Sequence, residues 1–154
     1  MSALRVLVAI AAVFALLAQA PSPGPEYFRG SWMCGAVRWT FAPLLKKSPW
    51  LRVVYGNPKR PDGFAIFGYV EGLHGYVYRD FHTDGSYANL SSTGPVNGIW
   101  TWTGPYYPAG GGDEMLGRIL YTIKSPSQYD RTFQQFLNGQ TIDRGGDTCR
   151  RLAN

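Results

Sequence analysis

Short segments of alternating apolar and polar residues, separated by turn-forming residues, fill most of this 154-residue chain. In Ile99–Thr103 tryptophan alternates with threonine, which is the period of two of a β-strand, and Met115–Lys124 is a longer segment of the same type. Pro61–Gly63 and Asn138–Gly139 supply the fixed φ angle and the tolerance of positive φ that tight turns require. The sequence therefore predicts an all-β domain.

Nine segments are expected as strands. They are residues 28–41, 50–55, 64–71, 75–81, 86–91, 99–103, 115–124, 128–137 and 147–152. The first is expected to bend at Gly35, and the glycine-rich residues 104–112 are expected to form a mobile loop. Short, local turns favour an up-and-down antiparallel meander over Greek-key crossings.

The first twenty residues have the pattern of an export signal. Arg5 precedes an unbroken apolar run of 13 residues, Val6–Ala18, and Ala18-Gln19-Ala20 has the small-x-small pattern of a cleavage site. We expect a signal peptide at 1–20, an extended proline-rich lead-in at 21–27 and the β-domain at 28–154. Because Pro21 hinders cleavage after Ala20, a cut after Ser22 is the second choice.

Export predicts a periplasmic or extracellular protein that meets the membrane only through the signal segment before cleavage. The alternatives are a retained membrane anchor, although a span needs about 20 residues, and a buried N-terminal helix. The net charge of +5 is scattered without a basic run or a nucleic-acid-binding module, so no nucleic acid partner is expected.

Cys34 and Cys149 are the two cysteines, and in an exported protein an even count indicates a disulfide. Two free thiols are the alternative. Only two histidines accompany them, so no metal site is expected.

A disulfide between the first and last strands has a geometric consequence. If those strands are antiparallel, Trp32 lies beside Arg151 on the face that carries the cysteines, where a guanidinium can stack on the indole. The sheet then closes on itself, and an antiparallel closing pair requires an even number of strands. The expected number of strands in the barrel is therefore eight or ten rather than nine.

Gly30-Ser31-Trp32 resembles the Gly-x-Trp motif on the first strand of lipocalins and related calycin barrels. In that superfamily the tryptophan packs at the closed end under an arginine of the last strand, a role that Arg151 matches, with Arg150 as its neighbour. Together with Ser125–Tyr129, Asn138–Gly139 and Asp147–Arg151, the motif is similar to exported bacterial lipocalin-like domains. The resemblance covers residues 21–154 in outline, with firm motifs only at the two ends.

Nitrobindin, a haem-binding relative with a similar first-strand motif, holds its iron through a histidine near the C-terminus. This sequence has no histidine after His82, so no haem or other cofactor is expected unless a tyrosine substitutes. No enzyme activity is expected either, because His82, Asp80, Asp84 and Ser86 lie within one turn, too close to converge as a catalytic triad. His82 is interpreted as a turn residue.

Aromatic residues make up 15 % of the chain and carry the functional prediction. We expect a small hydrophobic or amphipathic ligand in a cavity lined by rings with a few polar anchors. The expected aromatic lining residues are Tyr69, Tyr78, Trp100, Trp102, Tyr121 and Phe133. Arg118 and Arg131 are the expected anchors for a carboxylate, and loop 104–112 the expected rim. The alternative is a structural or interaction module with a filled core and an exposed aromatic strip that contacts carbohydrate or protein.

Overall fold

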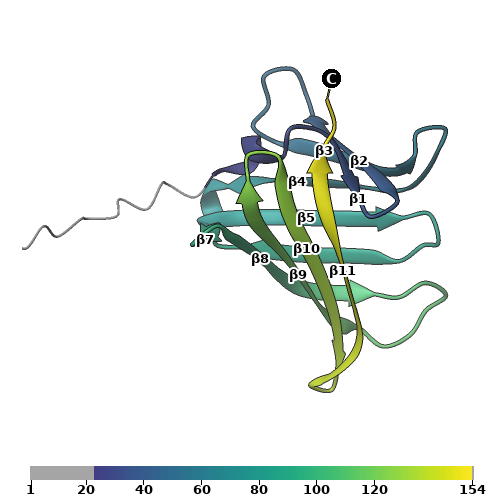
Figure 1. Cartoon of the computed structure of the whole chain (residues 1–154). Helices are drawn as coiled ribbons and strands as arrows, with labels where there is room; N and C mark the ends of the chain where they lie inside the picture. Colours follow the sequence, from purple (N-terminus) through teal and green to yellow (C-terminus); the bar gives the residue numbers. More distant parts are fainter. Residues whose placement is uncertain (1–22, 154) are drawn as a thin grey trace, which may run out of the picture.

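A computed structural model describes residues 23–153 as an all-β barrel (Figure 1). The predicted signal segment and its cleavage sites lie outside the described residues. The strands are β1 (Gly30–Cys34), β2 (Val37–Pro43), β3 (Leu51–Asn57), β4 (Arg60–Val70), β5 (Gly75–His82), β6 (Tyr87–Ser92), β7 (Pro95–Val96), β8 (Ile99–Tyr107), β9 (Met115–Ser125), β10 (Gln128–Leu137) and β11 (Gln140–Arg151). Two 3-10 helices, η1 (Pro25–Phe28) and η2 (Glu71–Leu73), are the only helices of residues 23–153, and neither is long and apolar enough to cross a membrane.

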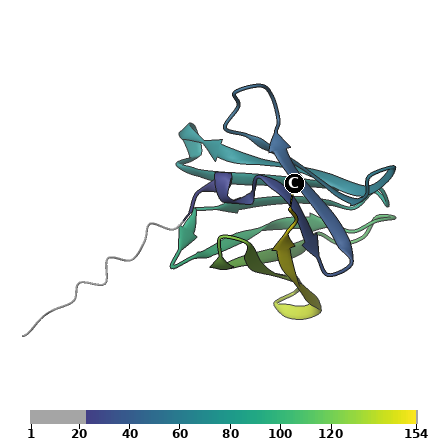
Figure 2. The ribbon, with the colours of Figure 1, turned by 45° about the horizontal axis from the view of Figure 1, so that its top comes forward.

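Antiparallel pairing runs through the sheet from β6 back to β1, across to β11 and on to β8, and a further β6–β8 pairing closes the ring (Figure 2). The two-residue β7 pairs with β8 alone among the described strands and stands outside the ring. Ten strands therefore form the wall, which confirms the antiparallel barrel and its even strand number.

Several local predictions were wrong. Pro61–Gly63 lies in β4 rather than in a turn, because the chain turns at Pro58–Lys59. Residues 28–41 are two strands, because the chain reverses completely at Gly35, whose φ of 56° suits a tight turn. Gly104–Tyr107 belongs to β8 rather than to a loop; a Cβ on Gly104 would lie 2.2 Å from the carbonyl oxygen of Asn89, so only glycine fits there. The lead-in 21–27 is not extended throughout, because Pro25 begins η1.

The end of the barrel next to η1 is filled with aromatic rings. Phe28 of η1 has no exposed surface, and its ring lies 5.3–6.1 Å from those of Phe41, Phe67, Trp100, Tyr121 and Tyr129. The 3-10 helix thus acts as a plug whose side chain completes this half of the core.

The contacts between the first and last strands follow the sequence prediction. Cys34 and Cys149 form a buried disulfide between β1 and β11, and Trp32 pairs with Arg151 in the register. The Arg151 guanidinium lies 4.2 Å from the ring centre of Trp32 and donates hydrogen bonds to the carbonyl oxygens of Arg29 and Tyr27. Arg151 of β11 therefore contacts both η1 and β1 and holds the three elements in place.

Candidate functional site

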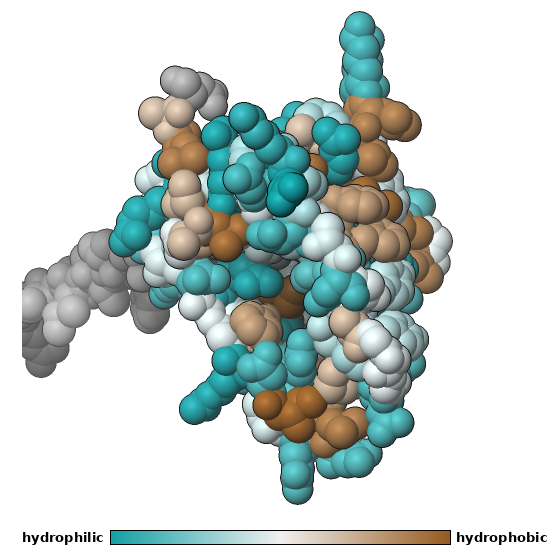
Figure 3. Space-filling model, turned by 90° about the vertical axis from the view of Figure 1, so that its right-hand side faces the viewer, coloured by the Kyte–Doolittle hydropathy of each residue, from teal (hydrophilic) through white to brown (hydrophobic). Residues whose placement is uncertain are grey.

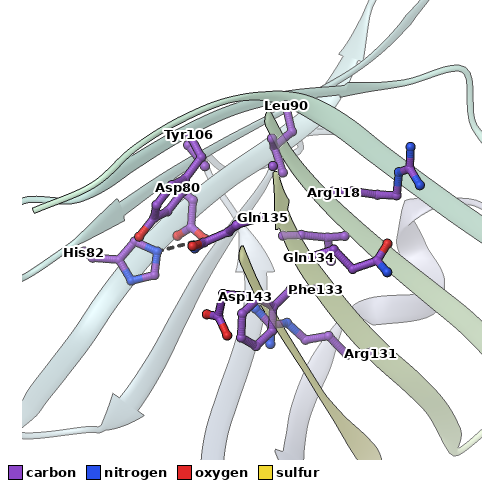
Figure 4. Close-up of a pocket in the computed structure, with 13 residues that line it drawn as sticks. Asp80, His82, Leu90, Tyr106, Arg118, Arg131, Phe133, Gln134, Gln135 and Asp143 are labelled. Atoms are coloured by element: carbon purple, nitrogen blue, oxygen red, sulfur yellow. Dashed lines mark ion pairs between the residues drawn. The ribbon is translucent and has the colours of Figure 1, made fainter. Parts of the chain in front are cut away.

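The opposite end of the barrel is hollow. Side chains there leave a cavity of about 320 Å³, and Figure 3, which looks onto this end, shows hydrophobic residues at the bottom of a recess between hydrophilic ones. Leu90, Ile119 and Phe133 supply apolar walls, while Asp80, His82, Tyr106, Arg131, Gln135 and Asp143 supply polar groups (Figure 4).

Two features of the strands keep this end open. Residues 140–148 of β11 have β10 as their only partner among the described strands, since β1 pairs with β11 only from Cys149 onward. The β10–β11 ribbon therefore extends past the ring and places Phe133, Gln135 and Asp143 along one side of the cavity. On the facing strands, the small residues Ala88 and Gly117 leave the space that larger side chains would fill.

Asp80 is the buried carboxylate of the site, with 3 % of its surface exposed. Tyr55 donates a hydrogen bond of 2.7 Å to its Oδ1, and His82 Nε2 lies 3.5 Å from its Oδ2. The Tyr55 hydroxyl also lies 3.1 Å from His82 Nδ1. Burial and the Asp80 carboxylate raise the pKa of Tyr55 far above its usual range, so Tyr55 remains a donor at neutral pH.

The hydrogen bond with Asp80 raises the pKa of His82 above its usual value, against the opposing effect of partial burial. Protonated His82 therefore stabilises the fold, fully so below about pH 6.5, and this contribution disappears as the pH rises through the raised pKa. We expect the melting temperature of the wild type to fall over this range more than that of His82→Asn. Thermal melts from mildly acidic to mildly alkaline pH measure it, with His74→Asn as the control; equal slopes in all three proteins would contradict it.

Arg131 is the buried cation. Its guanidinium lies over the rings of Trp39 and Phe133, at 4.9 and 5.5 Å from their centres, and its side chain is 14 % exposed. A carboxylate oxygen of Asp147 lies 3.9 Å away. Its Nε and the nearby hydroxyl groups of Tyr78 and Tyr121 have no hydrogen-bond partner among the described residues.

The predicted ligand-binding residues lie at different depths. Arg131 and Phe133 line the cavity. Tyr78, Trp100, Trp102 and Tyr121 point into the barrel and are at most 1 % exposed, but they fill the core beneath the cavity rather than line it. The stacked indoles of Trp100 and Trp102, 5.4 Å apart, form part of this layer.

Tyr69 and Arg118 lie apart from these residues. Tyr69 is 39 % exposed and packs against Tyr76 near the η1 end, because it stands two residues beyond the buried Phe67 in that direction. Arg118 touches the rim, but its guanidinium lies 5.1 Å from the ring centre of Phe136 and, in Figure 4, away from the polar groups around Asp80.

Sequence reasoning predicted Arg131 but missed Asp80 and His82 as members of the site. His82 is the last residue of β5 rather than a turn residue, and the alternation Tyr78, Asp80, His82 along this strand indicated that all three face inward. The predicted rim, residues 104–112, is mostly wrong: Tyr106 alone of these residues lines the cavity, and the β10–β11 ribbon supplies the other side.

Known protein families and curated proteins contain no match to this chain. Within residues 23–153, no three His, Cys, Asp or Glu side chains cluster in a way that could hold a metal ion. The function must therefore be argued from the geometry of the cavity.

Proposed function

We propose that this protein is an exported lipocalin-like barrel that binds a small amphipathic molecule in the cavity at its open end. The observation that carries the proposal is a cavity of about 320 Å³ with apolar walls and a buried, incompletely paired arginine. This volume falls at the small end of the range of ligand sites, of about 300–1,000 Å³.

Two further features support the lipocalin-like relationship and export. The stacking of Arg151 on Trp32 at the plugged end is the arrangement that the resemblance to calycin barrels implies. The disulfide supports an oxidising compartment, since such bonds are rare in the cytosol.

Filling the cavity tests the proposal. Ala88 lines the cavity with 4 % of its surface exposed, so Ala88→Leu places a larger apolar side chain in the ligand space. We expect wild-type protein to change its tryptophan fluorescence when titrated with fatty acids or hydrophobic dyes, and Ala88→Leu to lose at least about tenfold in affinity through steric exclusion. Asn89→Leu is the matched control, because the neighbouring residue faces the other side of β6.

A second candidate function is a contact surface on the outside of the barrel. Phe64, Phe81, Tyr87 and Tyr107 are cross-strand neighbours whose adjacent rings lie 4.9–6.0 Å apart, and three of them are 39–44 % exposed. This row and the filled η1 half of the core fit a module that contacts carbohydrate or protein. The titration separates the two functions: if no probe binds wild-type protein, the contact surface is the better explanation.

A further inference from the structure

The interior has more hydrogen-bond donors than acceptors. Five buried side-chain atoms lack a partner among the described residues, and all of them can donate: Tyr78 Oη, Trp100 Nε1, Trp102 Nε1, Tyr121 Oη and Arg131 Nε. Indole and guanidinium nitrogens can only donate. The buried carboxylate of Asp80, by contrast, already accepts a hydrogen bond from Tyr55. The Tyr121 oxygen can accept longer contacts from Tyr78 and Arg131, which lower its pKa, but the Tyr121 hydroxyl proton is then left without an acceptor. The site therefore has at least one donor more than its own acceptors can satisfy.

Three of these donors form one cluster. Arg131 and Tyr121 are directly opposite each other on β10 and β9, so both point into the barrel. Burial raises the pKa of Tyr121, and the nearby Arg131 guanidinium and Tyr78 hydroxyl offset part of this rise. Burial also holds the pKa of Tyr78 well above its usual value. Both tyrosines therefore keep their protons and present O–H groups beside the arginine.

The charge of Arg131 is only partly compensated: the buried Asp80 carboxylate favours it electrostatically, but no ion pair between the two is found among the described residues. Asp147 is its one salt-bridge partner among the described residues, the contact is long at 3.9 Å, and the Asp147 side chain is 42 % exposed. A guanidinium carries five N–H donors, and a buried cation is costly unless paired and hydrogen-bonded. A second carboxylate suits the planar guanidinium, because its two oxygens can accept two parallel N–H···O hydrogen bonds.

We propose that the ligand of the cavity, whose existence rests on the proposed function above, is a small organic acid. Its carboxylate is received by Arg131, which lines the cavity, and points toward the hydroxyl groups of Tyr121 and Tyr78 in the core directly beneath. Its apolar body lies against Leu90, Ile119 and Phe133, which face the cavity above this cluster. The carboxylate supplies the missing acceptors and completes the pairing of the arginine.

Three probes with one tail and different heads test the acid specificity in wild-type protein: octanoate, octanol and octylamine. Tryptophan fluorescence reports binding, because the Trp102 ring lies 5.5 Å from that of Tyr78. We expect octanoate to bind at least about tenfold more tightly than octanol, since charge-assisted hydrogen bonds are the strong ones, and octylamine to bind most weakly.

Variants test whether the preference for octanoate depends on the cluster of Arg131, Tyr121 and Tyr78. Arg131→Gln is expected to remove the advantage of octanoate over octanol, measured as the ratio of the two affinities in the same variant. Arg118→Gln is the matched control, because that guanidinium lies over Phe136 outside the cluster, and it should keep the full preference. If Arg131→Gln does not fold, Tyr121→Phe tests the same cluster and should reduce the preference several-fold.

The outcomes separate the two proposals. If none of the three probes binds wild-type protein, the proposed function fails. If octanol or octylamine binds as tightly as octanoate, the cavity binds ligands but the acid specificity is wrong, and water molecules satisfy the donors. If octanoate is preferred in wild type and equally in Arg131→Gln and Tyr121→Phe, the carboxylate binds elsewhere and the cluster is overturned as its site.

Discussion

Reduction of the Cys34–Cys149 disulfide is expected to lower the free energy of unfolding by about 4–5 kcal/mol. The bond joins residues 115 positions apart, so it closes almost the whole described chain into one loop. In the chain-entropy model, a loop of this length removes much of the conformational freedom of the unfolded state. The bond also fastens β1 to β11, a strand pair with only three residue pairs in its register.

Urea unfolding with and without a phosphine reductant measures this effect. Because both sulfurs are buried, the reductant must be added to unfolded protein before refolding. A Cys34→Ala/Cys149→Ala variant serves as the control, since its midpoint should not respond to the reductant. Equal midpoints for the oxidised and reduced wild type would contradict the prediction, as would peptide mapping that finds both thiols free.

Replacement of Trp32 by alanine is expected to cost about 3–5 kcal/mol, the usual range for removing a large buried aromatic side chain. Trp32 has no exposed surface, and its indole Nε1 donates a 2.7 Å hydrogen bond to the carbonyl oxygen of Phe28. The substitution removes that bond and the ring on which the Arg151 guanidinium stacks. It therefore loosens η1 as well as leaving a cavity.

Trp50→Ala is the matched control for this substitution. Trp50 is only partly buried and packs over Gly68 of β4. Urea unfolding should show a clearly smaller loss for Trp50→Ala than for Trp32→Ala. A loss below about 1 kcal/mol for Trp32→Ala, far under the range for buried aromatic residues, would mean that the Trp32 ring does not close the barrel.

Alternation along the strands, together with the cysteine pair, was enough to predict the barrel class and the stacking of Arg151 on Trp32. Side-chain parity decides which face a residue occupies, and the cysteine pair fixes how the two end strands align. The buried positions switch from even in β1 (Trp32, Cys34) to odd in β2 (Trp39, Phe41), which marks the two-residue turn after Cys34. The β1–β2 hairpin was missed because these residues were interpreted as the two faces of one bent strand.

The candidate site was predictable only in part. Arg131 and Phe133 share the inward parity of Tyr129, so their position followed from β10 alone. Arg118 and Tyr121 have opposite parity on β9 and could not both face inward. Tyr69 has the right parity but lies toward the wrong end, since alternation gives the face and not the depth along the barrel axis.

The polar cluster of Tyr55, Asp80 and His82 depends on contacts that no local pattern contains. Tyr55 on β3 reaches Asp80 on β5 across the intervening β4, which lacks a side chain at Gly63. A Cβ there would lie 2.3 Å from the Tyr55 hydroxyl. Only the three-strand register reveals that this glycine makes room for the hydrogen bond.

The most direct test of the central claim, a ligand-binding cavity at the open end, is native mass spectrometry of the protein purified from its natural host. We predict one small molecule per chain, retained under native conditions and lost on denaturation. The Ala88→Leu variant, purified in the same way, should carry no such mass. Wild-type protein that shows only the mass of its own chain under native conditions, as Ala88→Leu does, would contradict the account.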